Sequence, residues 1–139
     1  MKILDLPIST LAYVGDAAYE LMVRVAVLDT YHAKSGAIHK KVIQVVNASA
    51  QAIALARIEK LLTEKEKALV HRAANYSVPN ARQVDPADYR QATGFEALLG
   101  YLFLNHDLER LFMLVSEAEP DLNFSSLDLK DFCADFQNL

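Results

Sequence analysis

The fold is decided by the segments LAYVGDAAYE at residues 11–20 and TGFEALLGYLFL at residues 93–104. In both segments apolar residues recur every three or four positions, which is the period of an α-helix. Each segment also places one carboxylate, Asp16 or Glu96, inside this apolar pattern. A buried carboxylate destabilises a fold unless it has a partner or binds a cation. The two acids therefore indicate one divalent-metal site built by two helices; the alternative is a pair of acids that point outward into solvent.

Gly15 directly precedes Asp16 inside the first pattern. A glycine in the middle of a helix is less favourable than alanine by about 1 kcal/mol, so its presence predicts that a second backbone passes close by. We therefore expect another helix to approach next to Asp16. We also expect both acids on or beside core-facing stripes, and the stripe around Asp16 comprises Leu11, Val14, Ala18, Leu21, Met22, Val25 and Leu28.

Length and composition indicate a single all-α domain. The chain has 139 residues, of which 53% are hydrophobic, with only 4 Gly and 4 Pro. We expect the domain over residues 1–120, and a tail or short docked helix over 121–139. No run approaches the roughly 18 apolar residues of a membrane span, and the first residues do not resemble a signal peptide. The single cysteine, Cys133, fits a reducing cytoplasm.

Six helices are predicted from the periodicity and from end signals. Thr63 and Glu66 form a capping box, in which each side chain bonds the other's backbone amide. Asp85 before Pro86 is an N-cap followed by a first-turn proline, and Asp107 is a further N-cap. The expected helices span residues 9–28, 35–47, 49–61, 64–75, 86–105 and 108–117, with a short seventh around 127–136.

The net charge of −4 hides an uneven distribution. Residues 34–90 carry 10 basic and 5 acidic groups, whereas residues 91–139 carry 2 basic and 9 acidic groups. A basic centre between acidic ends suits a protein that binds a polyanion on one face, and the alternative is an ordinary solvated helical surface. The candidate contacts are a basic turn and the residues around the loop before the second segment: His39, Lys40, Lys41, Arg72, Asn75, Arg82 and Arg90.

The two segments carry a resemblance to a known family. Gly15-Asp16-Ala17 in an apolar helix, followed by Phe95-Glu96-Ala97-Leu98-Leu99-Gly100, resembles the catalytic domain of ribonuclease III. The chain is most similar to the Mini-III branch, whose members lack a double-stranded-RNA-binding domain. IHKK at residues 38–41 and ASAQA at 48–52 extend the match, which covers roughly residues 9–118.

The resemblance implies a homodimeric endoribonuclease that cuts double-stranded RNA and leaves a 5′-phosphate and a 3′-hydroxyl. Asp16 and Glu96 would be its catalytic residues and the ligands of Mg²⁺, for which Mn²⁺ can substitute. The implied substrate is the precursor of large-subunit (23S) ribosomal RNA, and a ribosomal protein is a further candidate partner. The implied two-fold interface uses the apolar residues around Tyr13, Val14, Leu98 and Tyr101.

Two positions depart from the long ribonucleases III, which use four acids per subunit. Ala12 and Thr93 stand where two of those acids are expected, so only two direct carboxylates remain. The Thr93 hydroxyl, one helical turn before Glu96, can hydrogen-bond a metal-bound water. Glu20, four residues after Asp16 on the same helix face, is a further candidate for this supporting role; the alternative is that Glu20 pairs with a base at the helix surface.

Two other functions stay open from the sequence alone. One is a non-catalytic RNA-binding or ribosome-assembly factor that retains the ribonuclease III fold. The other is a metal-dependent phosphohydrolase that acts on small nucleotides. Cleavage of duplex RNA with and without Mg²⁺ separates all three.

Overall fold

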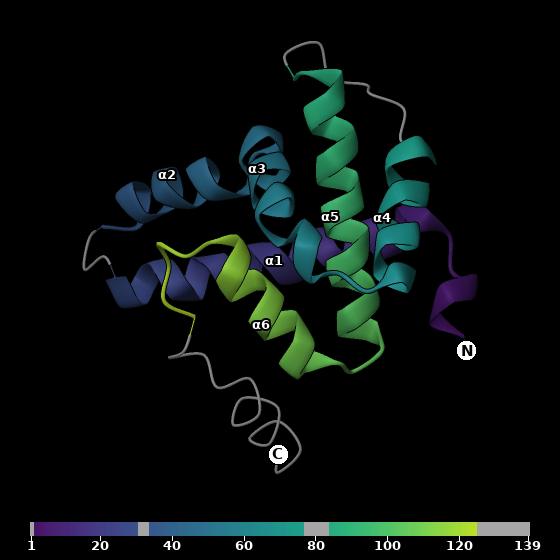
Figure 1. Ribbon diagram of the computed structural model, residues 1–139. Coiled ribbons are helices and arrows are strands. Elements are labelled where there is room, and N and C mark those ends of the chain that lie inside the picture. The colour runs from purple at the N-terminus through teal and green to yellow at the C-terminus, as the bar shows by residue number, and fades with distance from the viewer. Residues whose placement is uncertain (1, 31–33, 77–83, 125–139) are drawn as a thin grey trace.

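The computed structural model describes residues 2–30, 34–76 and 84–124, and these ranges form helices only (Figure 1). The prediction of an all-α fold is confirmed, with helix ends that differ from the expected ones by at most three residues. The elements are η1 (Ile3–Asp5), α1 (Ile8–Thr30), α2 (Ser35–Val46), α3 (Ala48–Ile58), η2 (Glu59–Leu61), α4 (Glu64–Tyr76), α5 (Pro86–Leu104) and α6 (Leu108–Ala118), where η marks a 3₁₀-helix.

The expected end signals of α4 and α5 are confirmed. The backbone N–H of Thr63 donates to Oε1 of Glu66 at 2.8 Å, and the N–H of Glu66 donates to the Thr63 hydroxyl oxygen at 3.1 Å. Asp85 accepts from the amides of Ala87 and Asp88 at 2.8 and 3.1 Å. The predicted capping by Asp107 is wrong: Asp107 directly precedes α6, but its side chain makes no capping hydrogen bond.

The central feature of the fold is the crossing of α1 and α5. Figure 1 shows α5 running across α1, with α3 on one side of α5 and α4 on the other. At the crossing the two backbones touch: a Cβ added at Gly15 would overlap the carbonyl oxygen of Glu96, and one at Gly100 would overlap the carbonyl oxygen of Leu11. The close approach predicted from Gly15 is confirmed, and it brings the backbone of α5 beside Asp16.

The core of the molecule corrects two expectations about apolar residues. Leu21 and Leu28 of α1 are 56% and 52% exposed, although both were expected in the core stripe. Leu11 and Met22 of that stripe are buried as expected, and the buried face of α1 also uses Tyr19, Val23, Ala26 and Val27. Tyr19 packs edge-on against Phe95 of α5, with ring centroids 5.1 Å apart. Leu98 is fully buried inside the protomer, so it is not available to an interface. Helical periodicity marks apolar positions, but the direction of approach of α5 decides which of them are covered.

An ion pair between Glu66 and Arg110 connects α4 to α6. The Arg110 guanidinium donates from Nε to Oε2 of Glu66 at 2.9 Å and from Nη2 to Oε1 at 2.6 Å. Nη2 also donates to the Leu61 carbonyl oxygen at 2.7 Å. Glu66 is 5% exposed, so this carboxylate depends on its partners to stay ionised.

Some predicted features lie outside the described residues. These are Arg82, Cys133, the seventh helix around 127–136 and most of the segment 121–139. Within the described ranges, none of the helices combines the length and the apolar character that a bilayer crossing requires.

Candidate active site

The structure brings Asp16 and Glu96 to one hollow beside the α1–α5 crossing. The hollow has a volume of about 380 Å³ and opens between the first half of α1, the end of α4 and the first half of α5. It is lined by Ile8, Ser9, Ala12, Tyr13, Asp16, Tyr76, Tyr89, Thr93 and Glu96. The two predicted catalytic acids and the two positions that depart from the four-acid pattern, Ala12 and Thr93, thus share one cavity.

The two carboxylates repel each other in a site that is only partly solvated. Burial raises the pKa of Glu96, the nearby charge of Asp16 raises it further, and hydrogen bonding by the Gln51 side chain partly opposes the rise, so that the pKa is about 7. Burial also raises the pKa of Asp16, and the charge of Glu20 adds to this effect. Both groups therefore lack the positive charge that would hold them ionised.

The expected burial of the two acids is half right. Glu96 is partly buried, as expected for a residue on the inner face of α5, whereas Asp16 is exposed. The reason lies in the crossing: α5 lies directly on Gly15 and covers the face next to it, which leaves Asp16 at the edge of the contact. Asp16 is consequently accessible from solvent, and Glu96 forms the inner wall of the hollow.

Thr93 lines the hollow, whereas Glu20 is not among its lining residues, and the two side chains have different partners. The Thr93 hydroxyl donates to the Tyr89 carbonyl oxygen at 3.0 Å, so toward a ligand in the hollow its oxygen acts as an acceptor. Glu20 pairs with Arg24 at 3.2 Å on the exposed surface of α1, which is the alternative considered from the sequence. Its charge still reaches Asp16, because it contributes to the raised pKa of that residue.

The predicted RNA-contacting residues fall into two separate groups. Arg72 and Asn75 lie exposed in the last turns of α4, and Arg90 lies exposed in the first turns of α5, next to Tyr76 and Tyr89 of the hollow. The second group, His39, Lys40 and Lys41, lies on α2, which Figure 1 places on the far side of α3 and α5 from α4. The structure therefore does not join the six described residues of this set into one patch; Arg82 lies outside the described residues.

Three residues of the site were missed as site residues from the sequence. Tyr76 and Tyr89 line the hollow, and the Gln51 side chain of α3 lowers the pKa of Glu96. Tyr89 lies four and seven residues before Thr93 and Glu96, a helical spacing that could have identified it. Gln51 lies three, four and seven residues before Ala54, Leu55 and Ile58, so it is a polar residue on an otherwise apolar face.

The donor set of the hollow fits a hard divalent cation. Asp16 and Glu96 offer carboxylate oxygens, the ligand type that Mg²⁺ takes in proteins, often with only one or two carboxylates and several waters. Burial and the charge of Asp16 both raise the pKa of Glu96, and a bound cation would oppose both effects. Within the described ranges, no cluster of three or more His, Cys, Asp or Glu side chains is arranged to hold a metal, so a third protein carboxylate does not join these two.

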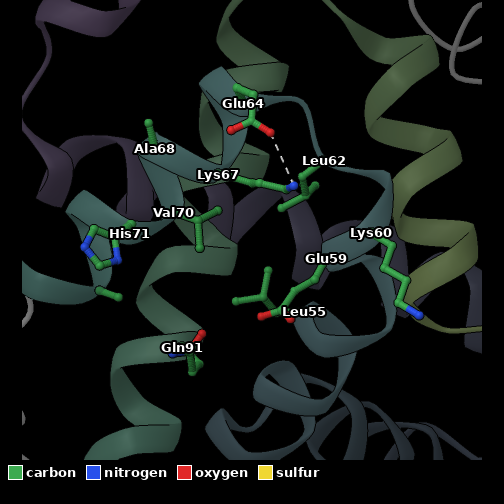
Figure 2. A pocket seen from close by; sticks show the side chains of 11 residues that line it. Leu55, Glu59, Lys60, Leu62, Glu64, Lys67, Ala68, Val70, His71 and Gln91 are labelled. Atoms are coloured by element: carbon green, nitrogen blue, oxygen red, sulfur yellow. Dashed lines mark hydrogen bonds and ion pairs between the residues drawn. The ribbon is translucent and has the colours of Figure 1, made fainter.

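A second hollow, of about 700 Å³, lies between α3, η2, α4 and the start of α5 (Figure 2). Figure 2 shows Leu55 and Val70 within it and the Glu64–Lys67 ion pair, 3.5 Å long, on its rim. None of the predicted catalytic residues lines this hollow. Acidic and basic side chains alternate around it, so it offers a polyanion no net attraction.

Comparisons with known proteins agree with this geometry. The Ribonuclease III domain family matches residues 9–107. The chain is 41% identical over 116 residues to the Mini-ribonuclease 3 of Symbiobacterium thermophilum, which covers 83% of this chain and 89% of that protein. It is 42% identical over 110 residues to the Mini-ribonuclease 3 of a Thermoanaerobacter species, which covers 78% of each.

A solved structure shares the fold of this chain. The crystal structure of a Fusobacterium nucleatum protein superposes with a TM-score of 0.74 and 28% sequence identity, over 81% of this chain and 90% of that one. Together with the match over residues 9–107, these relatives show that the chain belongs to the ribonuclease III family, within its Mini-ribonuclease 3 branch.

Proposed function

We propose that this protein is a Mg²⁺-dependent endoribonuclease that cleaves double-stranded RNA, with Asp16 and Glu96 as its catalytic residues and metal ligands. The observation that carries the proposal is that these two acids from α1 and α5 line one hollow, and that no base in the described part of the chain contributes to their pKa values. Family membership supports the reaction class, because the matched relatives are named as ribonucleases.

The chemistry divides between the cation and the protein. A bound Mg²⁺ supplies a Lewis acid for the phosphate oxygens and lowers the pKa of a coordinated water. Asp16, at the exposed edge of the hollow, and Glu96, at its inner wall, hold two negative charges at a fixed separation, because both helices are locked at the glycine crossing. The Thr93 hydroxyl, which donates to the Tyr89 carbonyl oxygen, lies on the same wall, and the charge of Glu20 acts on Asp16.

The end of α4 and the start of α5 form the proposed RNA-facing side of the site. Arg72, Asn75 and Arg90 present charge and hydrogen-bonding groups beside the hollow, and Arg82 belongs to the segment that connects these two helices. Tyr76 and Tyr89 add phenol groups at the wall itself. His39, Lys40 and Lys41 on α2 would contact a more distant part of a duplex, because they lie across the molecule from this side.

A second copy of the chain is the proposed cover for the exposed face of α1. Tyr13, Leu21 and Leu28 are largely exposed there, and their spacing of eight and seven residues keeps them along one face of the helix. An apolar stripe of this kind destabilises a free protomer in water. Two-fold dimers are the commonest closed assembly, and two active sites in one dimer could cut both strands of a duplex.

The finer identity of the substrate is also a proposal. We assign the precursor of 23S ribosomal RNA as the substrate, with a ribosomal protein as a candidate accessory partner and the cytoplasm as the location where that precursor is cut. These assignments follow from the resemblance to the Mini-III branch. Sequencing of RNA ends in a strain that lacks the protein tests them, because uncut 23S precursor ends should accumulate.

Cleavage of a short RNA duplex tests the central proposal. The purified protein should produce discrete fragments with 5′-phosphate ends in Mg²⁺ and none in excess chelator. Binding of duplex without cleavage would instead favour a non-catalytic RNA-binding factor. Hydrolysis of small nucleotides with intact duplex would favour a phosphohydrolase.

Sedimentation velocity at micromolar concentration tests the dimer. The wild-type protein should sediment as a dimer of its 15.5 kDa chain, and Leu21→Glu combined with Leu28→Glu should shift it to a monomer. Ile53→Glu, at another exposed apolar position on α3, serves as the matched control and should remain dimeric. A wild-type monomer would contradict the proposed assembly.

A further inference from the structure

Hydroxyl groups make up much of the wall of the hollow that holds Asp16 and Glu96. Five of the nine residues that line it carry a hydroxyl, and they come from α1, α4 and α5. These five are Ser9, Tyr13, Tyr76, Tyr89 and Thr93. None of the nine described lining residues is a lysine, an arginine or a histidine. The hollow therefore surrounds two carboxylates with neutral oxygen atoms.

The hollow is larger than a bare cation requires. Its volume of about 380 Å³ has room for several waters, because one water takes about 30 Å³ of the liquid. Mg²⁺ prefers octahedral coordination, gives up its waters reluctantly and often binds through one or two carboxylates. A cation held by Asp16 and Glu96 would therefore keep several waters, and the hydrogens of those waters require acceptors on the protein.

Ser9 and Tyr89 have equivalent places relative to the two acids. Ser9 lies seven residues before Asp16 on α1, and Tyr89 lies seven residues before Glu96 on α5. Seven residues are close to two turns of helix, so each hydroxyl residue shares a helix face with one acid. Two turns rise about 10 Å, which is of the order of the separation between acceptors on opposite sides of a fully hydrated Mg²⁺.

The Ser9 hydroxyl is not used by the fold in the described part of the chain. No hydrogen bond joins it to another described residue, and Ser9 is exposed, so it does not fill the core. Capping of α1 does not account for it either, because the amides of Thr10 and Leu11 donate to the Pro7 carbonyl oxygen at 3.0 and 3.1 Å. The Ser9 hydroxyl is therefore accessible to a ligand in the hollow.

The Tyr89 phenol is likewise not explained by packing. Tyr89 is partly buried, yet among the described residues it belongs to neither of the two apolar clusters of the core. Tyr101 of the same helix, by contrast, packs against both clusters. The Thr93 hydroxyl bonds the backbone carbonyl of Tyr89, and no hydrogen bond joins the phenol to another described residue.

We propose that Ser9 and Tyr89 bind the cation through its waters: their hydroxyl oxygens accept hydrogen bonds from coordinated water, while Asp16 and Glu96 supply the negative charge. The inference deepens the proposed function and rests on it. It gives the site two neutral groups that recognise a hydrated cation, one on each of the helices that carry the acids.

Removal of the two hydroxyls tests the inference. Ser9→Ala and Tyr89→Phe should both remain folded by circular dichroism, because Ser9 is exposed and Tyr89→Phe keeps the ring. Each should weaken Mn²⁺ binding by the free protein by about threefold to tenfold, as expected for one neutral hydrogen bond, and the double variant by about tenfold or more. The electron paramagnetic resonance signal of free Mn²⁺ measures the affinity. A double variant within twofold of the wild-type affinity would overturn the inference.

The matched control is Tyr101→Phe, which removes a phenol from the same helix at a residue that does not line the hollow. Its Mn²⁺ affinity should stay within twofold of the wild-type value. An equal loss of affinity in Tyr101→Phe and Tyr89→Phe would overturn the inference, because the phenols would then act through the fold. Weaker duplex binding by Tyr89→Phe in chelator, at unchanged Mn²⁺ affinity, would also overturn it and assign the phenol to RNA.

A measurement on the wild-type protein needs no variant. Hexaamminecobalt(III) is similar in size to hydrated Mg²⁺ and keeps its ammonia ligands, so it binds only through their N–H groups. Nuclear Overhauser contacts should connect its ammine protons with the Tyr89 ring and the Ser9 β-protons, and Mg²⁺ should abolish them by competition. Absence of both contacts at saturating hexaamminecobalt(III) would overturn the inference.

The proposed function and this inference can fail separately. If the hydroxyl variants lose Mn²⁺ affinity but the wild-type protein does not cleave RNA, the proposed function fails and the water-mediated cation site stands. If the wild-type protein cleaves duplex RNA and the double variant binds Mn²⁺ equally well, the inference fails alone.

Discussion

Glu66, which is buried, and Glu96, which is partly buried, have opposite electrostatic environments. Glu66 accepts two hydrogen bonds from Arg110 and one from the Thr63 amide. Burial alone would raise the pKa of Glu66, but these donors and the Arg110 charge lower it below its usual value. Glu96 is also removed from water, yet its nearest charge is another carboxylate, Asp16, and its pKa rises to about 7.

This difference distinguishes Glu66, which stabilises the fold, from Glu96, which we propose binds a cation. The fold supplies its own counter-ion at Glu66 and joins α4 to α6 through it. At the α1–α5 crossing it places two acids together, and no base among the described residues contributes to the pKa of either acid, although such an arrangement is destabilising in the free protein. Perturbed acids in a hollow are typical of functional sites, and here the missing positive charge is the one that a divalent cation carries.

Removal of either acid of the unpaired site should have the largest effect. Asp16→Asn and Glu96→Gln are each expected to lower kcat for duplex RNA by about a thousandfold or more, because an amide cannot supply the negative charge that a hard cation requires. Both variants should remain folded by circular dichroism, since each removes a repulsive charge. Near-wild-type turnover in either variant would contradict the assignment.

Removal of Arg110, the partner of Glu66, should lower the stability of the fold and leave activity largely unchanged. Arg110→Met leaves the Glu66 carboxylate buried without its base, and the free energy of unfolding should fall by about 3 kcal/mol. Urea unfolding measures the loss, and turnover of the folded fraction should stay within about twofold of the wild-type rate. A large loss of activity at unchanged stability would mean that α6 contributes to the site.

The two glutamates should also respond to pH in opposite directions. In the metal-free protein the raised pKa of Glu96 contributes stability below its ordinary value near 4.5, and that contribution is lost as the pH rises through about 7. The loss should be about 2 kcal/mol after allowance for partial exposure. Glu66, with a lowered pKa, contributes stability above its ordinary value and loses it as the pH falls.

Urea unfolding in chelator at several pH values between 5 and 8 separates the two acids. The wild-type protein should lose stability over this range relative to Glu96→Gln, because the variant lacks the titrating carboxyl. Arg110→Met should follow the wild-type trend above pH 6. Parallel profiles for the wild-type protein and Glu96→Gln would show that the Glu96 carboxyl is not held protonated by its surroundings.

Charge reversal beside the hollow should have the smallest effect. Arg72→Glu and Arg90→Glu should each weaken duplex binding by about three- to tenfold and reduce the slope of log affinity against log salt by about one unit. Arg82→Glu is expected to act similarly. Fluorescence anisotropy at three salt concentrations measures both quantities. If all three variants bind as the wild-type protein does, His39, Lys40 and Lys41 on α2 become the leading contacts.

Local sequence rules predicted most of the fold. The apolar period located all six α-helices of the described ranges, and the capping box at Thr63 and Glu66 was identified with both of its hydrogen bonds. The contact at Gly15 was predicted from the unfavourable position of a glycine in mid-helix. Each of these signals depends on a few neighbouring residues, which the sequence displays directly.

Interactions between segments that are distant in sequence could not be predicted from these local rules. The Arg110 partner of Glu66 lies 44 residues away, so the capping box revealed one role of this glutamate and not the other. The exposure of Asp16, Leu21 and Leu28 depends on where α5 crosses α1. Gln51 is a further case: its place on an apolar face is visible in the sequence, but its hydrogen bond to the Val46 carbonyl oxygen at the end of α2 depends on how α2 and α3 meet.

Calorimetric titration with Mg²⁺, with and without a non-cleavable RNA duplex, tests the central claim most directly. The claim is that Asp16 and Glu96 form one cation site that is completed by the substrate. The free protein should bind Mg²⁺ weakly, duplex should strengthen binding at least tenfold, and Glu96→Gln should abolish both effects. Tight binding that duplex does not improve, or binding that persists in Glu96→Gln, would contradict the claim.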